Sequence, residues 1–149
     1  MASPSRSKPS VLLVEDILSN AKRMRRLLQN QGYDVVIVRS YESALNALQN
    51  QPFQSFDPDD NKDKENHVHR AFSLVITDNE IFSDDSRTEQ MEAAISIASA
   101  VRERFKSTPV IVWSTSISNN SCFSAALEKS SGSEDLSNLL RSLSLPFKS

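Results

Sequence analysis

The sequence predicts a single α/β domain built on a doubly wound parallel sheet. Short hydrophobic runs recur along the chain, and helical patterns of apolar residues lie between them. The runs are continuous rather than alternating, which is typical of strands buried on both faces of a parallel sheet. Strict alternation of strand and helix favours right-handed crossovers in such a sheet. A length of 149 residues suits one domain with a substantial core.

The strands are predicted from apolar runs of similar length. These runs are VLLV (11–14), VVIV (35–38), LVIT (74–77) and VIVW (110–113), and a further short apolar stretch precedes Lys129. Each is too short for a helix of ordinary length and lacks the spacing of an amphipathic helix, so we expect a strand at each position.

The helices are predicted from apolar residues at helical spacing. The four sets are Ile17, Ala21, Met24 and Leu28; Tyr41, Ala44, Leu45 and Leu48; Met91, Ile95, Ala98, Val101 and Phe105; and Leu136, Leu139, Leu140 and Leu143. Gly32 stands where the first helix needs a C-terminal cap, and Ser40 where the second needs an N-terminal cap. The third helix is expected to end before Pro109.

Two polar stretches are predicted to lie outside the packed core. We expect a flexible leader over 1–9, a folded domain over 10–146, and a disordered polar insertion over 51–70, between the second helix and the third strand. The insertion begins like a calcium-binding loop at Asp57. That interpretation fails because Lys62 stands where such a loop needs glycine.

Composition excludes several classes of protein. The 17 basic and 19 acidic side chains give a net charge of −2, which argues against a general binder of nucleic acid. No apolar run approaches the roughly 20 residues that cross a bilayer, and the N-terminus lacks a secretory signal. The single cysteine, Cys122, fits a reducing cytoplasm. With two glycines in the chain, a glycine-rich phosphate loop is excluded.

Acidic residues follow two of the predicted strands. Glu15 and Asp16 come directly after the first strand, and Asp78 directly after the third. Taken singly, each has a simpler explanation: Glu15 and Asp16 as caps of the following helix, and Asp78 as a turn residue. Ligands of doubly wound sheets bind beyond the carboxyl ends of the strands. If the two strands are neighbours, the three acids therefore converge on one crevice.

Three carboxylates in one crevice indicate a cation site. Because like charges repel at close range, a shared proton or a cation is needed, and Mg²⁺ prefers carboxylates together with waters and phosphate oxygens. A carboxylate beside Mg²⁺ can act as a nucleophile towards phosphorus, which forms an aspartyl phosphate. Such chemistry also needs a hydroxyl and a cation, and Ser114 and Lys129 are placed in the sequence to supply them.

The segments VLLVEDILSN, LLQNQGYDVVIV, LVITDNEIF, RERFKSTPVIVWST and LEKSSGSEDLSNLL, in this order, resemble the receiver domain of response regulators. The resemblance runs from about Ser10 to Leu143 and implies a flavodoxin-like fold of five parallel strands in the order 2-1-3-4-5. It implies Asp78 as the phospho-acceptor, with Ser114 and Lys129 as its catalytic partners. It also implies that Glu15 is the other member of the acidic pair, and that Asp16, Asp78 and the backbone carbonyl of Glu80 hold Mg²⁺.

The chain departs from the family at several positions. Ile81-Phe82 replaces the usual Met-Pro, Ser130 the usual proline, and Ala126 the usual switch aromatic. Only 14 residues separate Ser114 from Lys129, about two helical turns fewer than in the family, so the fourth helix is expected to be shortened or unwound.

The resemblance implies a signalling function rather than an enzyme in the usual sense. A histidine kinase or a phosphotransfer protein would donate the phosphoryl group, and a further protein partner would read the change. We expect a stand-alone regulator or a receiver excised from a larger kinase. The departures leave a second hypothesis open, a pseudo-receiver that acts as a protein-interaction scaffold. A metal-dependent phosphatase is a third, because Glu80 lies two residues beyond Asp78.

Overall fold

The computed structural model describes residues 9–66, 71–78, 80–82, 90–92, 94–104, 108–114, 124–128 and 132–143. The elements of this part of the chain are β1 (Ser10–Val14), α1 (Leu18–Asn30), β2 (Asp34–Val38), α2 (Tyr41–Leu48), β3 (Phe53–Asp57), β4 (Lys62–Asn66), β5 (Leu74–Thr77), β6 (Glu80–Phe82), β7 (Gln90–Glu92), α3 (Ala94–Arg104), β8 (Val110–Ser114), β9 (Ala125–Glu128) and α4 (Ser133–Ser142). Nearly all of the predicted leader lies outside the described residues.

A five-stranded parallel sheet forms the centre of the molecule, in the order β2-β1-β5-β8-β9. Counted along the sheet strands alone this is 2-1-3-4-5, so the predicted fold and strand order are confirmed. The register sets Val14 opposite both Val38 and Thr77. The carboxyl ends of β2, β1 and β5 therefore lie level at one edge of the sheet.

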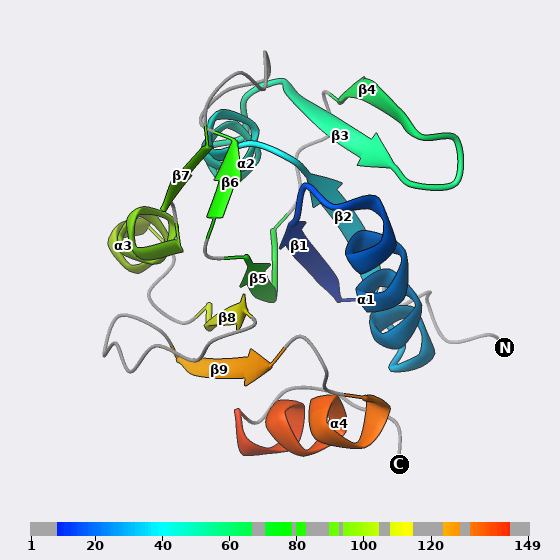
Figure 1. Ribbon diagram of the computed structural model, residues 1–149. Helices are drawn as coiled ribbons and strands as arrows, with labels where there is room; N and C mark the ends of the chain where they lie inside the picture. The colour runs from blue at the N-terminus through cyan, green and yellow to red at the C-terminus, as the bar shows by residue number, and fades with distance from the viewer. Residues whose placement is uncertain are drawn as a thin grey trace, which may run out of the picture.

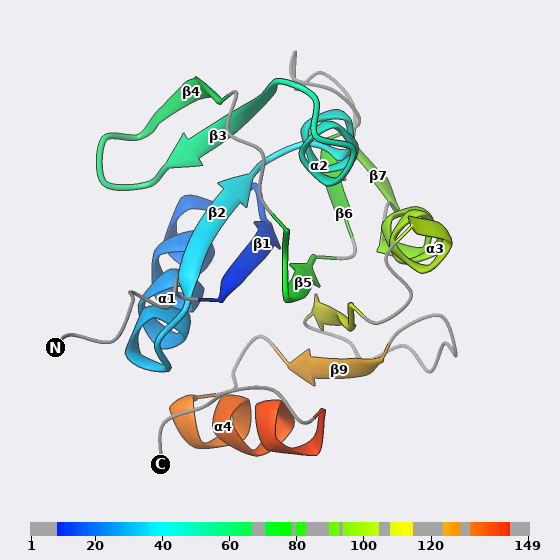
Figure 2. The same ribbon diagram turned by 180° about the vertical axis from the view of Figure 1, so that it is seen from behind.

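Helices cover both faces of the sheet, which is why its strands are apolar throughout. Alternate residues of β1 belong to opposite core clusters: Leu12 packs with α2 and α3, whereas Leu13 packs with α1 and α4. Figure 1 shows the sheet between these two pairs of helices, and Figure 2 shows the same layers from behind. All five residues of β1 are buried, as expected for the second strand from the edge of a two-sided sheet.

The predicted helix ends are confirmed for α1 and α2. Gln31 caps α1, and Gly32 follows with a φ of 92°, a left-handed conformation that glycine adopts without steric cost. At the start of α2, the Ser40 hydroxyl oxygen accepts a hydrogen bond of 3.0 Å from the Ser43 N–H. The first turn leads from α1 into β2, and the second leads from β2 into α2.

The prediction of a disordered insertion over 51–70 is wrong for 53–66, which form an antiparallel hairpin of β3 and β4. Phe53 and Phe56 are 5% and 4% exposed, so the hairpin is anchored by apolar side chains that its polar composition conceals. Its turn has ordinary chemistry: Asp57 Oδ1 accepts the Asp59 N–H at 3.0 Å, and Asn61 has a φ of 52°. Residues 67–70 lie outside the described residues.

The third helix begins later than predicted. Met91 belongs to β7, which pairs antiparallel with β6, and α3 begins at Ala94. Met91 therefore lies before the first residue of α3, and its helical spacing from Ile95 is a coincidence. It pairs with Ile81 of β6 instead. Phe105, predicted in the same helix, lies outside the described residues, as does the segment 115–123 where a shortened helix is expected.

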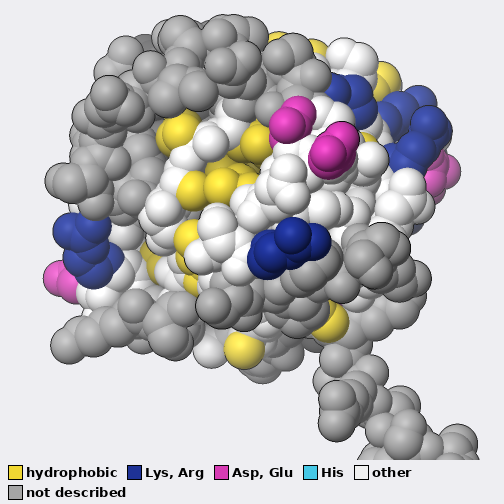
Figure 3. Space-filling model, turned by 90° about the horizontal axis from the view of Figure 1, so that it is seen from below, with side chains coloured by type: hydrophobic (Ala, Val, Ile, Leu, Met, Phe, Trp, Pro, Cys, Tyr) yellow, Lys and Arg dark blue, Asp and Glu magenta, His cyan; other side chains and the backbone are white. Residues whose placement is uncertain are grey.

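The surface seen from below carries charges of both signs. Hydrophobic side chains gather near the centre of this face, and acidic and basic side chains lie around them (Figure 3). This mixture agrees with the near balance of acidic and basic residues in the sequence. Among the helices of the described residues, none has the length and hydrophobicity that a membrane span requires.

Candidate functional site

Three carboxylates meet at the carboxyl edge of the sheet. Glu15 and Asp16 follow β1, Asp78 follows β5, and these strands are neighbours with Val14 opposite Thr77. One oxygen from each carboxylate lies within 4.8 Å of the other two. Glu15 is fully buried, whereas Asp16 and Asp78 are half-buried and so reachable from solvent. The predicted convergence of the three acids is therefore found in the fold.

Backbone hydrogen bonds continue the sheet into this cluster. The Glu15 N–H donates to the Val38 carbonyl at 3.0 Å, and the Asp78 N–H donates to the Val14 carbonyl at 2.9 Å. The buried Thr77 hydroxyl donates to the Asp78 carbonyl at 2.8 Å. The main chain that carries Asp78 is therefore held on both sides, which restricts where its carboxylate lies. Sequence reasoning did not assign a role to Thr77.

Glu15 has a structural role as well as a place in the cluster. Its Oε2 accepts a hydrogen bond of 3.1 Å from the N–H of Ile17, the residue that precedes α1. This bond reaches the N-cap residue itself, and no side chain caps the first turn of α1, so the capping alternative is not found in its usual form. The bond is compatible with membership of the acidic cluster, because a carboxylate has a second oxygen.

The remaining predicted site residues are described in part. Ser114 is the last residue of β8, and β8 lies beside β5, so its backbone reaches the same edge of the sheet as Asp78. Glu80 begins β6, two residues after Asp78. The side chains of Ser114 and Glu80 lie outside the described structure, and so does Lys129, which directly follows β9 in sequence.

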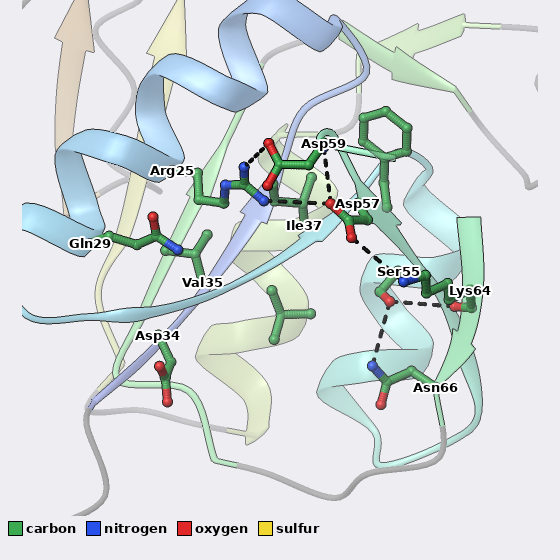
Figure 4. Close-up of a pocket in the computed structure, with 12 residues that line it drawn as sticks. Arg25, Gln29, Asp34, Val35, Ile37, Ser55, Asp57, Asp59, Lys64 and Asn66 are labelled. Carbon is green, nitrogen blue, oxygen red and sulfur yellow. Dashed lines mark hydrogen bonds and ion pairs between the residues drawn. The ribbon is translucent and has the colours of Figure 1, made fainter. Parts of the chain in front are cut away.

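A separate pocket of about 500 Å³ lies between α1, β2 and the β3–β4 hairpin (Figure 4). Its lining residues are Arg25, Gln29, Asp34, Val35, Val36, Ile37, Ser55, Phe56, Asp57, Asp59, Lys64 and Asn66. None of the three clustered acids belongs to this lining. The pocket exists because the hairpin forms one of its walls. The sequence signals that could have indicated the hairpin are Phe53, Phe56 and the turn between β3 and β4.

Ion pairs fasten the hairpin to α1 at one end of this pocket. Arg25 lies 2.7 Å from Asp59 and 3.6 Å from Asp57, and Lys64 lies 3.5 Å from Asp57. The hydrogen bond from the Asp59 N–H, aided by Lys64, lowers the pKa of Asp57. Correspondingly, the hydrogen bond to Asp60 raises the pKa of Lys64. Arg25 of α1 is therefore engaged with the hairpin.

No family model and no curated protein sequence matches the chain. Solved structures do match. The receiver domain of a sensor histidine kinase from Pseudomonas aeruginosa PAO1, with a magnesium ion coordinated in its active-site cleft, is 16% identical with a TM-score of 0.65; the match covers 93% of this chain and 99% of that chain. A CheY-like receiver domain protein from Methanospirillum hungatei JF-1 is 17% identical with a TM-score of 0.66, over 93% and 95%.

A chemotaxis response regulator of Vibrio cholerae is 20% identical with a TM-score of 0.66, and the match covers 92% of this chain and 99% of that chain. At such low identities the likeness concerns the fold. The chain therefore has the fold of response-regulator receiver domains, and the clustered acids lie at the edge of the sheet where doubly wound folds bind their ligands.

Proposed function

We propose that this chain is a phospho-accepting receiver domain of two-component or phosphorelay signalling, with Asp78 as the acceptor. The observation that carries the proposal is the cluster of Glu15, Asp16 and Asp78 at the carboxyl edge of a receiver-type sheet. In the proposed reaction an Asp78 carboxylate oxygen forms a new P–O bond while the P–N bond to a donor histidine breaks. The departing imidazole nitrogen keeps the bonding electron pair and takes up a proton.

The donor set fits Mg²⁺. Carboxylate oxygens are the ligands that this hard cation prefers, and three of them lie within 4.8 Å of one another. Asp16, Asp78 and the backbone carbonyl of Glu80 would hold the ion, with Glu15 beside them. When bound, the ion offsets the negative charge of the acids and of the phosphoryl oxygens. The hydrogen bonds of Thr77 and Asp78 keep the acceptor backbone fixed during the transfer.

Ser114 and Lys129 complete the proposal. The hydroxyl of Ser114 would donate to one phosphoryl oxygen, and the ammonium of Lys129 would pair with another. A histidine kinase or a phosphotransfer protein would be the donor, and a protein partner would recognise the phosphorylated state. We expect no enzymatic turnover. Release of inorganic phosphate over many cycles would instead favour a phosphatase.

The rival proposal is a pseudo-receiver that binds partners without being phosphorylated. Ala126, within β9, stands where the family has its switch aromatic, and Ile81-Phe82 replaces Met-Pro. These positions bear on the switch that follows phosphorylation, whereas the acids bear on phosphorylation itself. Because the rival is a protein that is not phosphorylated, it predicts that the cluster neither binds Mg²⁺ nor accepts a phosphoryl group.

Intact-protein mass spectrometry separates the two proposals. The protein is incubated with acetyl phosphate, with and without Mg²⁺, and weighed. We expect one phosphoryl adduct that requires Mg²⁺ and is absent in Asp78→Asn. The control Glu103→Gln, which neutralises an exposed carboxylate on α3, should accept the phosphoryl group normally. Absence of the adduct in the unaltered protein, together with absence of Mg²⁺ binding by calorimetry, would leave the pseudo-receiver.

A further inference from the structure

Arg39 is a cation that follows β2 at the edge of the sheet where the acidic cluster lies. It comes directly after Val38, and Val38 lies opposite Val14 in the register of β1 and β2. The Glu15 N–H donates to the Val38 carbonyl at 3.0 Å, so the pairing of the two chains continues beyond the end of β1. Glu15 and Arg39 are therefore neighbours across this edge, with backbones about 5 Å apart.

The side chains of these two neighbours belong to the same face of the sheet. Leu13 and Ile37 lie in the core cluster that includes the buried residues of α1. Because side chains alternate along an extended chain, Glu15 and Arg39 return to that face two residues later. The contact made by Arg39 agrees with this: its guanidinium carbon lies 4.2 Å from the centre of the Phe56 ring, and Phe56 belongs to the same cluster.

The inserted hairpin holds the Arg39 guanidinium near the edge of the sheet. Phe56 of β3 is 4% exposed and Arg39 is half-buried, and a cation over an aromatic face is attracted more strongly as water is removed. The hairpin is itself tied to α1, because Arg25 lies 2.7 Å from Asp59. The guanidinium therefore rests on a support that is fixed to the rest of the domain.

The acids of the cluster need a positive charge near them. One oxygen from each of Glu15, Asp16 and Asp78 lies within 4.8 Å of the other two. Glu15 is fully buried, so water does not screen its charge. A guanidinium stays protonated throughout the physiological pH range, and it lowers the electrostatic cost of carboxylates nearby.

We propose that Arg39 is a built-in counter-cation of the acidic cluster, held in place by Phe56 of the hairpin, and that it lowers the affinity of the site for Mg²⁺. Without Mg²⁺, the guanidinium offsets part of the repulsion among the acids. When Mg²⁺ binds, the two cations repel each other, so the metal binds more weakly than it would in the same site without Arg39. The inference rests on the proposed metal site, and it gives the hairpin a part in setting the Mg²⁺ concentration at which that site fills.

Calorimetric titration with Mg²⁺ tests the sign of this effect. We expect Arg39→Gln to bind Mg²⁺ about fivefold more tightly than the unaltered protein, because a repelling charge is removed. Arg39→Lys keeps the charge and should bind as the unaltered protein does. The matched control is Arg26→Gln, which removes an exposed cation of α1 and should change the affinity by less than about twofold. A merely structural role predicts the opposite sign, since damage to the site weakens binding.

A double-mutant cycle without Mg²⁺ tests the counter-cation role independently of the metal. Urea midpoints are measured in the presence of a chelator for Arg39→Gln, Glu15→Gln and the double variant. We expect Arg39→Gln to lower the midpoint, and to lower it by less than about half as much in the Glu15→Gln background, because the buried charge that Arg39 offsets is then absent. In Glu42→Gln, at an exposed acid of α2, the loss should be undiminished.

Phe56→Leu tests the part played by the hairpin. Leucine keeps most of the apolar volume but has no aromatic face to hold the guanidinium. In the Phe56→Leu background, Arg39→Gln should change Mg²⁺ affinity by no more than about twofold, because the charge is no longer fixed beside the acids.

Three results would overturn the proposal. The first is that Arg39→Gln binds Mg²⁺ no more tightly than the unaltered protein. The second is that the urea effects of Arg39→Gln and Glu15→Gln simply add, or that Arg39 couples more strongly to Glu42. The third is that Phe56→Leu leaves the fivefold gain unchanged, which would remove the hairpin from the mechanism.

Failure of the proposed function gives a different pattern. If the unaltered protein binds no Mg²⁺, the proposed receiver chemistry fails at its metal site, and the metal-free cycle alone then decides the role of Arg39. If Glu15→Gln fails to fold, Asp16→Asn takes its place in the cycle with the same expected coupling.

Discussion

Replacing Phe56 by alanine tests whether the inserted hairpin is part of the folded domain. Phe56 is 4% exposed and packs in the core cluster that includes Met24 and Ile37. Its ring also lies beneath the Arg39 guanidinium, 4.2 Å from the ring centre. Truncation of a buried phenylalanine costs about 3–5 kcal/mol. We expect about 3 kcal/mol here, at the low end, because the pocket beside the ring allows its neighbours to relax.

Urea unfolding followed by Trp113 fluorescence measures this change. Trp113 is the single tryptophan of the chain and is fully buried, so its emission reports global unfolding. The matched variant Phe56→Leu keeps most of the apolar volume and should cost about 1 kcal/mol. Hydrogen exchange at the β3 amides should accelerate in Phe56→Ala, which places the weakening in the hairpin.

The disordered insertion suggested by composition gives the opposite expectation. A phenylalanine already in solvent would change the free energy of unfolding by no more than about 0.5 kcal/mol when truncated. A value that small, with unchanged exchange of the β3 amides, would refute the packing argument.

Three further changes have definite expected outcomes. Burial raises the pKa of Tyr33 from 10.0 to about 12. The unfolded chain therefore releases this proton at a lower pH than the folded protein, and the free energy of unfolding falls as pH rises between these two values. By pH 11 the fall is about 1.4 kcal/mol, and Tyr33→Phe should avoid it. Ser40→Ala removes the hydroxyl that caps α2 and should cost about 1 kcal/mol in urea unfolding, with Ser40→Thr nearly neutral. Asp16→Asn should weaken Mg²⁺ binding at least about tenfold in calorimetry, while Glu103→Gln has no effect; equal affinities would remove Asp16 from the metal site.

The central sheet was predictable because its strands satisfy one simple condition. Residues such as Leu12 and Leu13 are both fully buried although they point to opposite faces, so the sequence shows a continuous apolar run. Helix limits were predictable where a local signal exists, as with Ser40 and Gly32. Such signals depend on the residues immediately around them, and tertiary packing here reinforces them.

The hairpin was not predictable in the same way, because most of its hydrogen bonds and ion pairs join polar residues. Strand β4 is largely exposed, and its lysine and acidic side chains resemble those of a solvated linker. The informative residues were Phe53, Phe56 and the Asp57 turn. They stabilise the hairpin only where α1, α2 and β2 provide the surfaces on which it packs. The pocket between α1, β2 and the hairpin depends on the same tertiary arrangement, so no local pattern indicates it.

The acidic cluster was predictable in part. Residues after neighbouring parallel strands must meet at one edge, but which strands are neighbours is a property of the whole sheet. The order β2-β1-β5 was supplied by the resemblance of several segments, and it places Asp16 beside Asp78. For Ser114 and Lys129 the backbone order of β8 and β9 agrees with the prediction, and their roles stay predictions.

The acidic cluster carries an electrostatic cost in the folded protein. Three carboxylates with oxygens within 4.8 Å repel one another, and Glu15 is fully removed from solvent. One of them, Glu15, gains a hydrogen bond from the start of α1, which offsets part of the cost. Mg²⁺ bound among the three carboxylates would offset the remaining repulsion. The phosphoryl transfer proposed for Asp78 uses the same cation, so a measurement of Mg²⁺ affinity tests the electrostatic argument and the proposed function together.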